Sequence, residues 1–122
     1  MSKYHNKITY VDGIKFDSQK EASYYCYLRQ MEKDGKIRDL RLQVEYELLP
    51  KITGEKVRQL KTKTKVVPFT KQAAVVYRAD FVYVDCATGL EEVIDVKGRK
   101  TKEYILKKKM MLALLGIEII EV

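Results

Sequence analysis

Two aspartates and one lysine are the residues of this chain whose types and spacing suggest catalysis. Asp95 and Lys97 are separated by a single residue, and Asp80 precedes them in a segment rich in Val, Tyr and Phe. Such segments favour β-strands, and the Cys-Ala-Thr-Gly stretch between them predicts a turn. If Asp85 pairs with Leu90 across this turn, Asp80 lies opposite Asp95. Side chains that face each other in this way have Cβ atoms about 4.5–5.5 Å apart.

Two carboxylates at this distance repel each other unless one of them takes up a proton or a cation lies beside them. Lys97 alternates onto the same face as Asp95, and Arg78 onto the same face as Asp80. The neighbouring residues are apolar, and isolated charges in such surroundings are costly, so a functional site is favoured. This set suits phosphodiester hydrolysis assisted by Mg²⁺, for which Mn²⁺ substitutes. Asp80 and Asp95 would be metal ligands, the carbonyl of Val96 a further ligand, and Lys97 the cation that orients water or stabilises the transition state.

The charge of the chain points to a polyanionic partner. There are 24 Lys and Arg against 17 Asp and Glu, a formal net charge of +7. Residues 51–71 and 97–109 each contribute +6, and the acidic residues 72–96 between them contribute −4. A single charged run is usually solvated surface, but this order is expected where basic residues bind phosphates beside carboxylates that hold a cation. Nucleic acid is favoured over an acidic membrane surface. The candidates for phosphate contacts flank the site in sequence: Lys20, Arg78, Arg99, Lys100 and Lys102.

Several classes of site and protein are excluded or disfavoured by composition. His5 is the one histidine, which excludes zinc sites and catalysis built on several histidines. Cys26 and Cys86 lie far apart without metal-binding spacing, which favours a reduced, cytosolic chain over a disulfide. The N-terminal residues do not resemble a signal peptide, and the longest apolar stretch, Met110 to Leu115, is too short to span a membrane. At 122 residues, we expect a single domain over 1–122.

The elements that must position these residues follow from local patterns. Asp12-Gly13 predicts a small hairpin near the start, and Ser18 predicts the N-cap of a helix over about 18–34. Alternation predicts a strand over 40–48, with further strands at about 73–84 and 90–97. A second helix is expected from Thr101 to about Leu115, then a closing strand over 117–122. The basic segment 50–72 is either a mobile arm that contacts nucleic acid or a hairpin. The third strand, second helix and last strand form a βαβ unit, so we expect an α/β fold with a mixed central sheet flanked by helices.

At these residues the sequence resembles the PD-(D/E)XK, or restriction-endonuclease-like, nuclease superfamily. The motif is Asp80 followed by Asp95-Val96-Lys97, and the expected αβββαβ order matches the core of that superfamily. The resemblance is closest to small phage-encoded proteins related to Holliday-junction resolvases, through Phe16–Glu21, Tyr77–Phe81 and Val93–Gly98. It implies that Glu21 is a third acidic site residue, as a metal ligand or water contact. Ala79 stands where the signature has proline, a structural position that often varies.

Each of these residues also has a simpler structural interpretation. Glu21 lies three residues after Ser18 and completes a capping box, a role that is compatible with site membership. Lys97 could be a solvated residue at a strand end, and Asp80 could form a salt bridge with Arg78. Gln43 points to the polar face of its strand and is more simply a surface residue than a site residue. Three helical tyrosines, Tyr24, Tyr25 and Tyr27, are interpreted as packing residues.

The function expected from residues and resemblance together is a Mg²⁺-dependent endodeoxyribonuclease. The resemblance implies selectivity for branched DNA in phage replication or recombination, in the cytoplasm of the bacterial host. Symmetrical cutting of two strands would need two copies of the site, so a homodimer is expected, without any association with a membrane. The principal rival is a nucleic-acid-binding module that has this fold and cleaves nothing, with salt-dependent affinity. A second rival is a protein-interaction domain of the phage replication machinery.

Overall fold

A small hairpin opens the part of the chain that the computed structural model describes, residues 7–122. Its strands are β1 (Thr9–Val11) and β2 (Ile14–Phe16). The two residues of the turn, Asp12 and Gly13, have φ of 52° and 77°, and this left-handed conformation at both positions suits the twist of a two-residue hairpin. The hairpin expected at Asp12-Gly13 is therefore confirmed.

Helix α1 (Gln19–Lys33) follows at once and covers one face of the sheet. Its N-cap is Ser18, whose Oγ accepts a hydrogen bond from the Glu21 N–H at 3.1 Å. Ala22, Tyr25 and Leu28 are buried at helical spacing and pack toward the sheet. The helix lies within one residue of the predicted range at each end.

The central sheet has four strands in the order β3-β6-β7-β8. These are β3 (Ile37–Leu49), β6 (Val75–Asp85), β7 (Glu91–Asp95) and β8 (Ile119–Glu121). The first three pair in antiparallel fashion, whereas β7 and β8 are parallel and are joined by α2 (Lys102–Leu115). The sheet is therefore mixed, and the class is α/β with two helices, as predicted.

The two helices cover opposite faces of this sheet. Phe81 and Ile94 are paired across β6 and β7 and lie in the core under α1, whereas the next pair, Val82 and Val93, lies in the core under α2. Neighbouring residues of a strand point to opposite faces, so each helix has its own apolar core. Met111 of α2 is fully buried in the second core.

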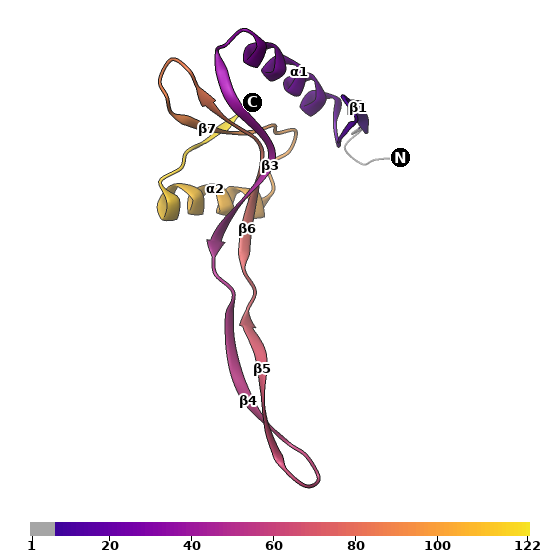
Figure 1. Cartoon of the computed structure of the whole chain (residues 1–122), viewed down its shortest axis with the longest axis vertical. Helices are drawn as coiled ribbons and strands as arrows, with labels where there is room; N and C mark the ends of the chain where they lie inside the picture. The colour runs from indigo at the N-terminus through magenta and orange to yellow at the C-terminus, as the bar shows by residue number, and fades with distance from the viewer. Residues whose placement is uncertain (1–6) are drawn as a thin grey trace.

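A long hairpin of β4 (Ile52–Gln59) and β5 (Thr64–Gln72) extends away from this body in line with β3 and β6 (Figure 1). Of the two interpretations open for residues 50–72, the structure has the hairpin. We call residues 52–72 the arm. Its side chains are mostly exposed, in contrast to those of β6 and β7.

Some predicted bounds differ from the structure. β3 is longer than the predicted 40–48, and β7 ends at Asp95 rather than at 97. β8 begins at Ile119 rather than at 117, because the N–H of Ile117 still bonds to the last turn of α2.

The described residues contain no helix that is both long enough and apolar enough to cross a membrane. Cys26 and Cys86 are exposed free thiols, in agreement with the expectation that they form no disulfide.

Candidate active site

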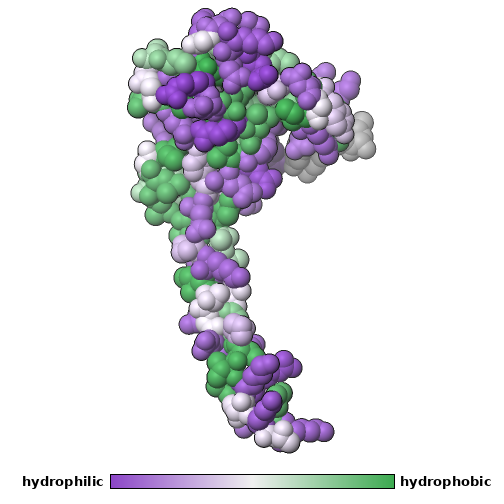
Figure 2. Space-filling model, in the orientation of Figure 1, coloured by the Kyte–Doolittle hydropathy of each residue, from purple (hydrophilic) through white to green (hydrophobic). Residues whose placement is uncertain are grey.

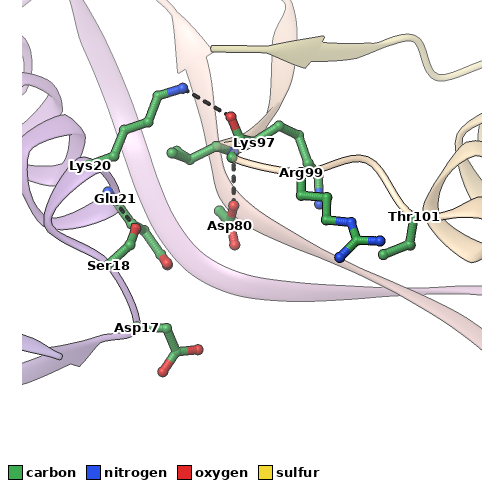
Figure 3. A pocket seen from close by; sticks show the side chains of 10 residues that line it. Asp17, Ser18, Lys20, Glu21, Asp80, Lys97, Arg99 and Thr101 are labelled. Carbon is green, nitrogen blue, oxygen red and sulfur yellow. Dashed lines mark hydrogen bonds between the residues drawn. The ribbon is translucent and has the colours of Figure 1, made fainter. Parts of the chain in front are cut away.

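Three parts of the chain meet around a cavity of about 530 Å³ beside the end of β7. They are the start of α1, the middle of β6, and the segment that leads from β7 to α2. Figure 3 shows Glu21 and Lys20 reaching in from α1, with Asp80 and Arg99 on the other sides. The lining residues are Asp17, Ser18, Lys20, Glu21, Asp80, Val96, Lys97, Gly98, Arg99 and Thr101.

The register that brings the two aspartates together is the predicted one. Phe81 pairs with Ile94, and the Asp85 N–H bonds to the Leu90 carbonyl at 2.9 Å, so Asp80 is in register with Asp95. Beyond this pair the two strands separate. There the Oδ2 of Asp80 accepts a hydrogen bond from the N–H of Val96 at 2.8 Å (Figure 3). The Val96 N–H, which could otherwise extend the strand pairing of β7, is therefore bonded to the Asp80 side chain.

The pKa of Asp80 is raised by its surroundings. Burial is the largest cause, and with the negative charge of Asp95 it raises the pKa to about 6, against the opposing effects of the Val96 N–H and the Lys97 ammonium. An aspartate whose pKa is raised this far is unusual, and such shifts are characteristic of functional sites.

Asp95 is the one buried charged residue of the described chain, with an exposed fraction of 2%. Its Oδ2 accepts a hydrogen bond from the Tyr77 hydroxyl at 2.5 Å, and burial together with this bond raises the pKa of Tyr77 above its usual range. Its Oδ1 accepts no hydrogen bond of ordinary geometry, and its contact is the Lys97 ammonium at 2.9 Å. The Oδ1 atom of the buried Asp95 is therefore contacted by the charged Lys97 ammonium and by no hydrogen bond of ordinary geometry.

Lys97 is held from two sides. Besides the ion pair with Asp95, its ammonium lies 3.9 Å from the ring centre of Tyr104, within the range of a cation–π interaction. Lys97 lines both the main cavity and a neighbouring one of about 190 Å³. Asp80 lines only the larger cavity and Asp95 only the smaller. The structure thus brings the predicted trio together, but at the boundary of two cavities and not in one pocket.

Glu21 takes part in both of the roles considered for it, through different atoms. Its N–H is bound by Ser18 in the helix cap, while its Oε1 accepts a hydrogen bond from Gln43 Nε2 at 3.1 Å. Burial is the main cause that raises the pKa of Glu21 to about 7, and the carboxylates of Asp80, Asp17 and Asp95 add to the shift. The side chain of Glu21 therefore belongs to the acidic cluster of the site and not to the cap.

Gln43 is the residue that sequence analysis placed at the surface and that the structure connects to the site. It is exposed and lies in β3 between two paired residues, Leu42 and Val44, at the position in register with Asp80. Its φ is 53°, which side-chain-bearing residues rarely adopt and which costs about 1 kcal/mol or more. Glutamine has no preference for this conformation, so no sequence signal marks it. Asp17 was missed for a similar reason, since only the fold brings it to the cavity.

Of the five predicted phosphate-binding residues, two line the main cavity and three do not. Lys20 and Arg99 line the main cavity, and Lys20 Nζ donates a hydrogen bond to the Lys97 carbonyl at 3.0 Å (Figure 3). Arg78 lines the smaller cavity and forms an ion pair with Glu45 at 2.8 Å, not with Asp80. The other two lie at the start of α2, where Lys100 pairs with Glu121 and Lys102 is exposed.

The donors of the site fit a hard divalent cation held by few protein ligands. No group of three or more His, Cys, Asp or Glu side chains suited to a metal is found among residues 7–122. Mg²⁺ needs less than this, since it is commonly bound by one or two carboxylates together with substrate phosphates and water. Asp80 and Asp95 supply the two carboxylates, and Asp95 Oδ1 is a buried oxygen without a hydrogen bond. Val96 contributes its N–H to Asp80 and lines the cavity.

Comparison with known proteins gives one relationship. The chain matches no curated protein and no solved structure. A family model described as a protein of unknown function, DUF1064, matches residues 1–115. Since that match covers nearly the whole chain, the protein belongs to the DUF1064 family.

Proposed function

We propose that this protein is a metal-dependent endodeoxyribonuclease with a restriction-endonuclease-like core. The observation that carries the proposal is the buried Asp95–Lys97 ion pair in register with Asp80, whose pKa is raised to about 6. A protein gains little stability from two opposed carboxylates beside a half-buried lysine, so their presence is best explained by chemistry. The net charge of +7 supplies the attraction for a polyanionic substrate.

In this proposal each residue has one task. Asp80 and Asp95 hold Mg²⁺ or Mn²⁺, with Glu21 as a further carboxylate and the Val96 carbonyl as a further oxygen. The bound ion supplies polarisation of a phosphoryl oxygen and a more acidic water. Lys97, fixed by Asp95 and the Tyr104 ring, places its charge where negative charge develops on the phosphate.

Binding and orientation of the DNA backbone are proposed for the cations around the cavity. Lys20 and Arg99 line the cavity itself and are placed to contact the phosphate being cut and its neighbours. The remaining three, Arg78, Lys100 and Lys102, lie further out, where they would contact flanking phosphates. Arg78 and Lys100 would have to exchange a carboxylate partner for a phosphate, so their contribution should be the smaller.

We further propose branched DNA as the substrate, in phage replication or recombination in the bacterial cytoplasm, and a homodimer as the active unit. These proposals follow from the resemblance to resolvase-like nucleases and from the need for two sites to cut two strands. The outward side of α2 offers a surface for the second copy, since Ile105, Leu106 and Leu112 are 42%, 58% and 55% exposed.

The proposal is tested by incubating the protein with labelled four-way junction, duplex and single-stranded DNA in Mg²⁺, Mn²⁺ or EDTA. We expect cleavage of the junction with either metal and none in EDTA. Asp95→Asn and Lys97→Met should each lower the cleavage rate at least about 100-fold while binding is largely kept. The matched controls are Asp39→Asn and Lys109→Met, which change exposed residues away from the cavity and should cleave at the wild-type rate.

The alternative function is a nucleic-acid-binding module without catalysis. The observation in its favour is that residues 7–122 contain no cluster of three metal-ligating side chains. Intact DNA under all conditions, together with retained binding, would select this alternative. Cleavage by either site variant at the wild-type rate would show that the assigned roles are wrong.

A further inference from the structure

The arm has one face on which positive charge gathers. Residues that pair across an antiparallel ribbon share a face, so Arg58 and Lys65 lie side by side, as do Lys56 and Val67. The same face continues through Phe69 to Lys71 by alternation. It therefore presents four cations along its length, from near the tip to the base.

The packing on this face keeps the cations extended along the ribbon. Gly54 has no side chain, and the space where a Cβ would lie is taken by Lys71 Cε and the Phe69 ring, at 2.5 and 3.0 Å from that position. The Lys56 ammonium lies 5.7 Å from the centre of the same ring. The aromatic ring thus holds two lysine side chains against the ribbon, and their charges remain at the surface.

The cations of the arm form no ion pairs within the described part of the chain. Residues 52–72 contain six cations and one acidic residue, Glu55. In the described chain none of these cations has a carboxylate within 4.0 Å, whereas eight cations outside the arm do: Arg29, Arg38, Arg41, Arg78, Lys97, Lys100, Lys107 and Lys108. A dense group of unpaired cations on an extended element is the electrostatic pattern of a polyanion contact.

The shape of the arm fits double-helical DNA better than double-helical RNA. It is a two-stranded ribbon that stands clear of the body, with purple polar residues along it in Figure 2. The major groove of B-form DNA is about 12 Å wide and admits such a ribbon, whereas that of A-form RNA is too narrow and deep. The eight residues of β4 cover about 27 Å, or about eight base pairs, at about 3.4 Å per residue and per base pair.

We infer that the arm is a second contact for double-helical DNA, lying in the major groove with its cationic face, Lys56, Arg58, Lys65 and Lys71, toward the phosphates. This contact lies outside the candidate active site and needs neither metal nor cleavage. The choice of DNA over other polyanions rests on the proposed function. The arm would bind the duplex away from the site and so hold long substrates in register.

The test compares two variants with equal loss of charge. The arm variant carries Lys56→Gln, Arg58→Gln, Lys65→Gln and Lys71→Gln; the control carries Lys15→Gln, Lys33→Gln, Lys36→Gln and Lys109→Gln, all exposed and outside the arm. Binding of a fluorescent duplex of about 20 base pairs is measured in EDTA over a range of KCl. Each lost phosphate contact lowers the slope of log K against log salt by about 0.9, so we expect a decrease of about 3–4 for the arm variant and less than about 1 for the control.

Two further measurements test whether the arm contacts the duplex. A duplex of about six base pairs is too short to reach the site and the arm together, so the loss of affinity in the arm variant should be smaller than on the long duplex. If circular dichroism shows that the quadruple variant has lost the ribbon, the double variant Arg58→Gln/Lys65→Gln replaces it, with an expected decrease of about 2 in the slope. An unchanged slope in a folded variant overturns the inference.

The outcomes separate this inference from the proposed function. Normal cleavage by the wild type with an unchanged slope for the arm variant would remove the arm contact and leave the nuclease. A reduced slope without cleavage by any form would leave the arm contact and remove the nuclease. The opposite face of the ribbon carries Val57 and Val66, paired and 68% and 56% exposed. If Val57→Asp with Val66→Asp dissociates an oligomer while the cationic variant keeps its slope, the arm binds a second copy and the inference is wrong.

Discussion

At the scale of single residues, the site is defined by the crowding of negative charge around Asp80. Burial is the largest cause that raises the pKa of Glu21 to about 7 and that of Asp80 to about 6, and the neighbouring carboxylates add to both shifts. The Lys97 ammonium forms an ion pair with Asp95, and Lys20 and Arg99 line the cavity beside Glu21 and Asp80. The site is thus electrostatically costly without a ligand and should become less so when a cation binds.

This cost predicts that Asp80→Asn stabilises the metal-free protein at high pH. The pKa of Asp80 is raised from 3.8 to about 6 in the folded state, so the folded state binds the proton more tightly than the unfolded state does. The associated stability is fully present below about pH 4 and is lost as the pH rises through about 6. In urea unfolding with EDTA, we expect the variant to gain about 1 kcal/mol at pH 8 and less than half of that at pH 4.5, after allowance for solvent screening.

The control for this measurement is Asp39→Asn, because Asp39 is exposed and lies in an ion pair at the surface. Its effect on the free energy of unfolding should be the same at both pH values. Equal destabilisation by Asp80→Asn at pH 8 and pH 4.5 would show that the hydrogen bond to the Val96 N–H outweighs the charge repulsion.

At the scale of elements, the start of α1 couples a helix cap to the site, and its two functions can be separated. Ser18→Ala removes the acceptor for the Glu21 N–H and should lower the free energy of unfolding by about 1 kcal/mol. Glu21→Gln keeps the backbone bond and removes a charge that is already unfavourable at pH 8, so we expect undiminished stability with reduced cleavage. Chemical denaturation and the cleavage assay measure the two effects. A loss of stability in Glu21→Gln without a loss of activity would assign the side chain to the cap.

The positive φ of Gln43 in β3 makes a second prediction at this scale. Because the φ of Gln43 is 53°, glycine should be tolerated there better than alanine, by about 1 kcal/mol. The matched control is Glu47, an exposed residue of the same strand whose φ is not positive, where glycine should be the less stable by about 0.5–1 kcal/mol. Thermal unfolding of the four variants gives both differences. The same sign at both positions would show that the backbone at Gln43 is not strained in solution.

The elements differ in how far the sequence could predict them. The turn between β6 and β7 is short and β-prone on both sides, so pairing Asp85 with Leu90 was enough to place Asp80 opposite Asp95. The positive φ of Gln43 depends on how β3 fits against Asp80, a tertiary effect that no local pattern encodes. The sequence alone did not decide whether residues 50–72 form a hairpin, because both faces of the arm are exposed. A strand without a buried face lacks the alternation of apolar residues by which strands are recognised.

At the scale of the whole molecule, the unusual feature is that α2 exposes several large apolar side chains. Tyr104 and Met111 are buried against the sheet, while Ile105, Leu106 and Leu112 remain exposed. Figure 2 shows apolar surface in the region of α2, next to the base of the arm. Large exposed apolar patches mark interaction sites.

This surface predicts how the proposed homodimer is held together. Leu106→Glu with Leu112→Glu should convert a dimer into a monomer in sedimentation equilibrium, because both side chains would be buried only in the assembly. Circular dichroism should show an unchanged fold, since the two residues are 58% and 55% exposed in the single chain. The control is Leu90→Glu, a residue 66% exposed in the turn between β6 and β7, which should remain dimeric. A wild-type protein that is monomeric at all concentrations would instead require that one site cut the two strands in succession, and paired cuts would then accumulate only after singly cut DNA.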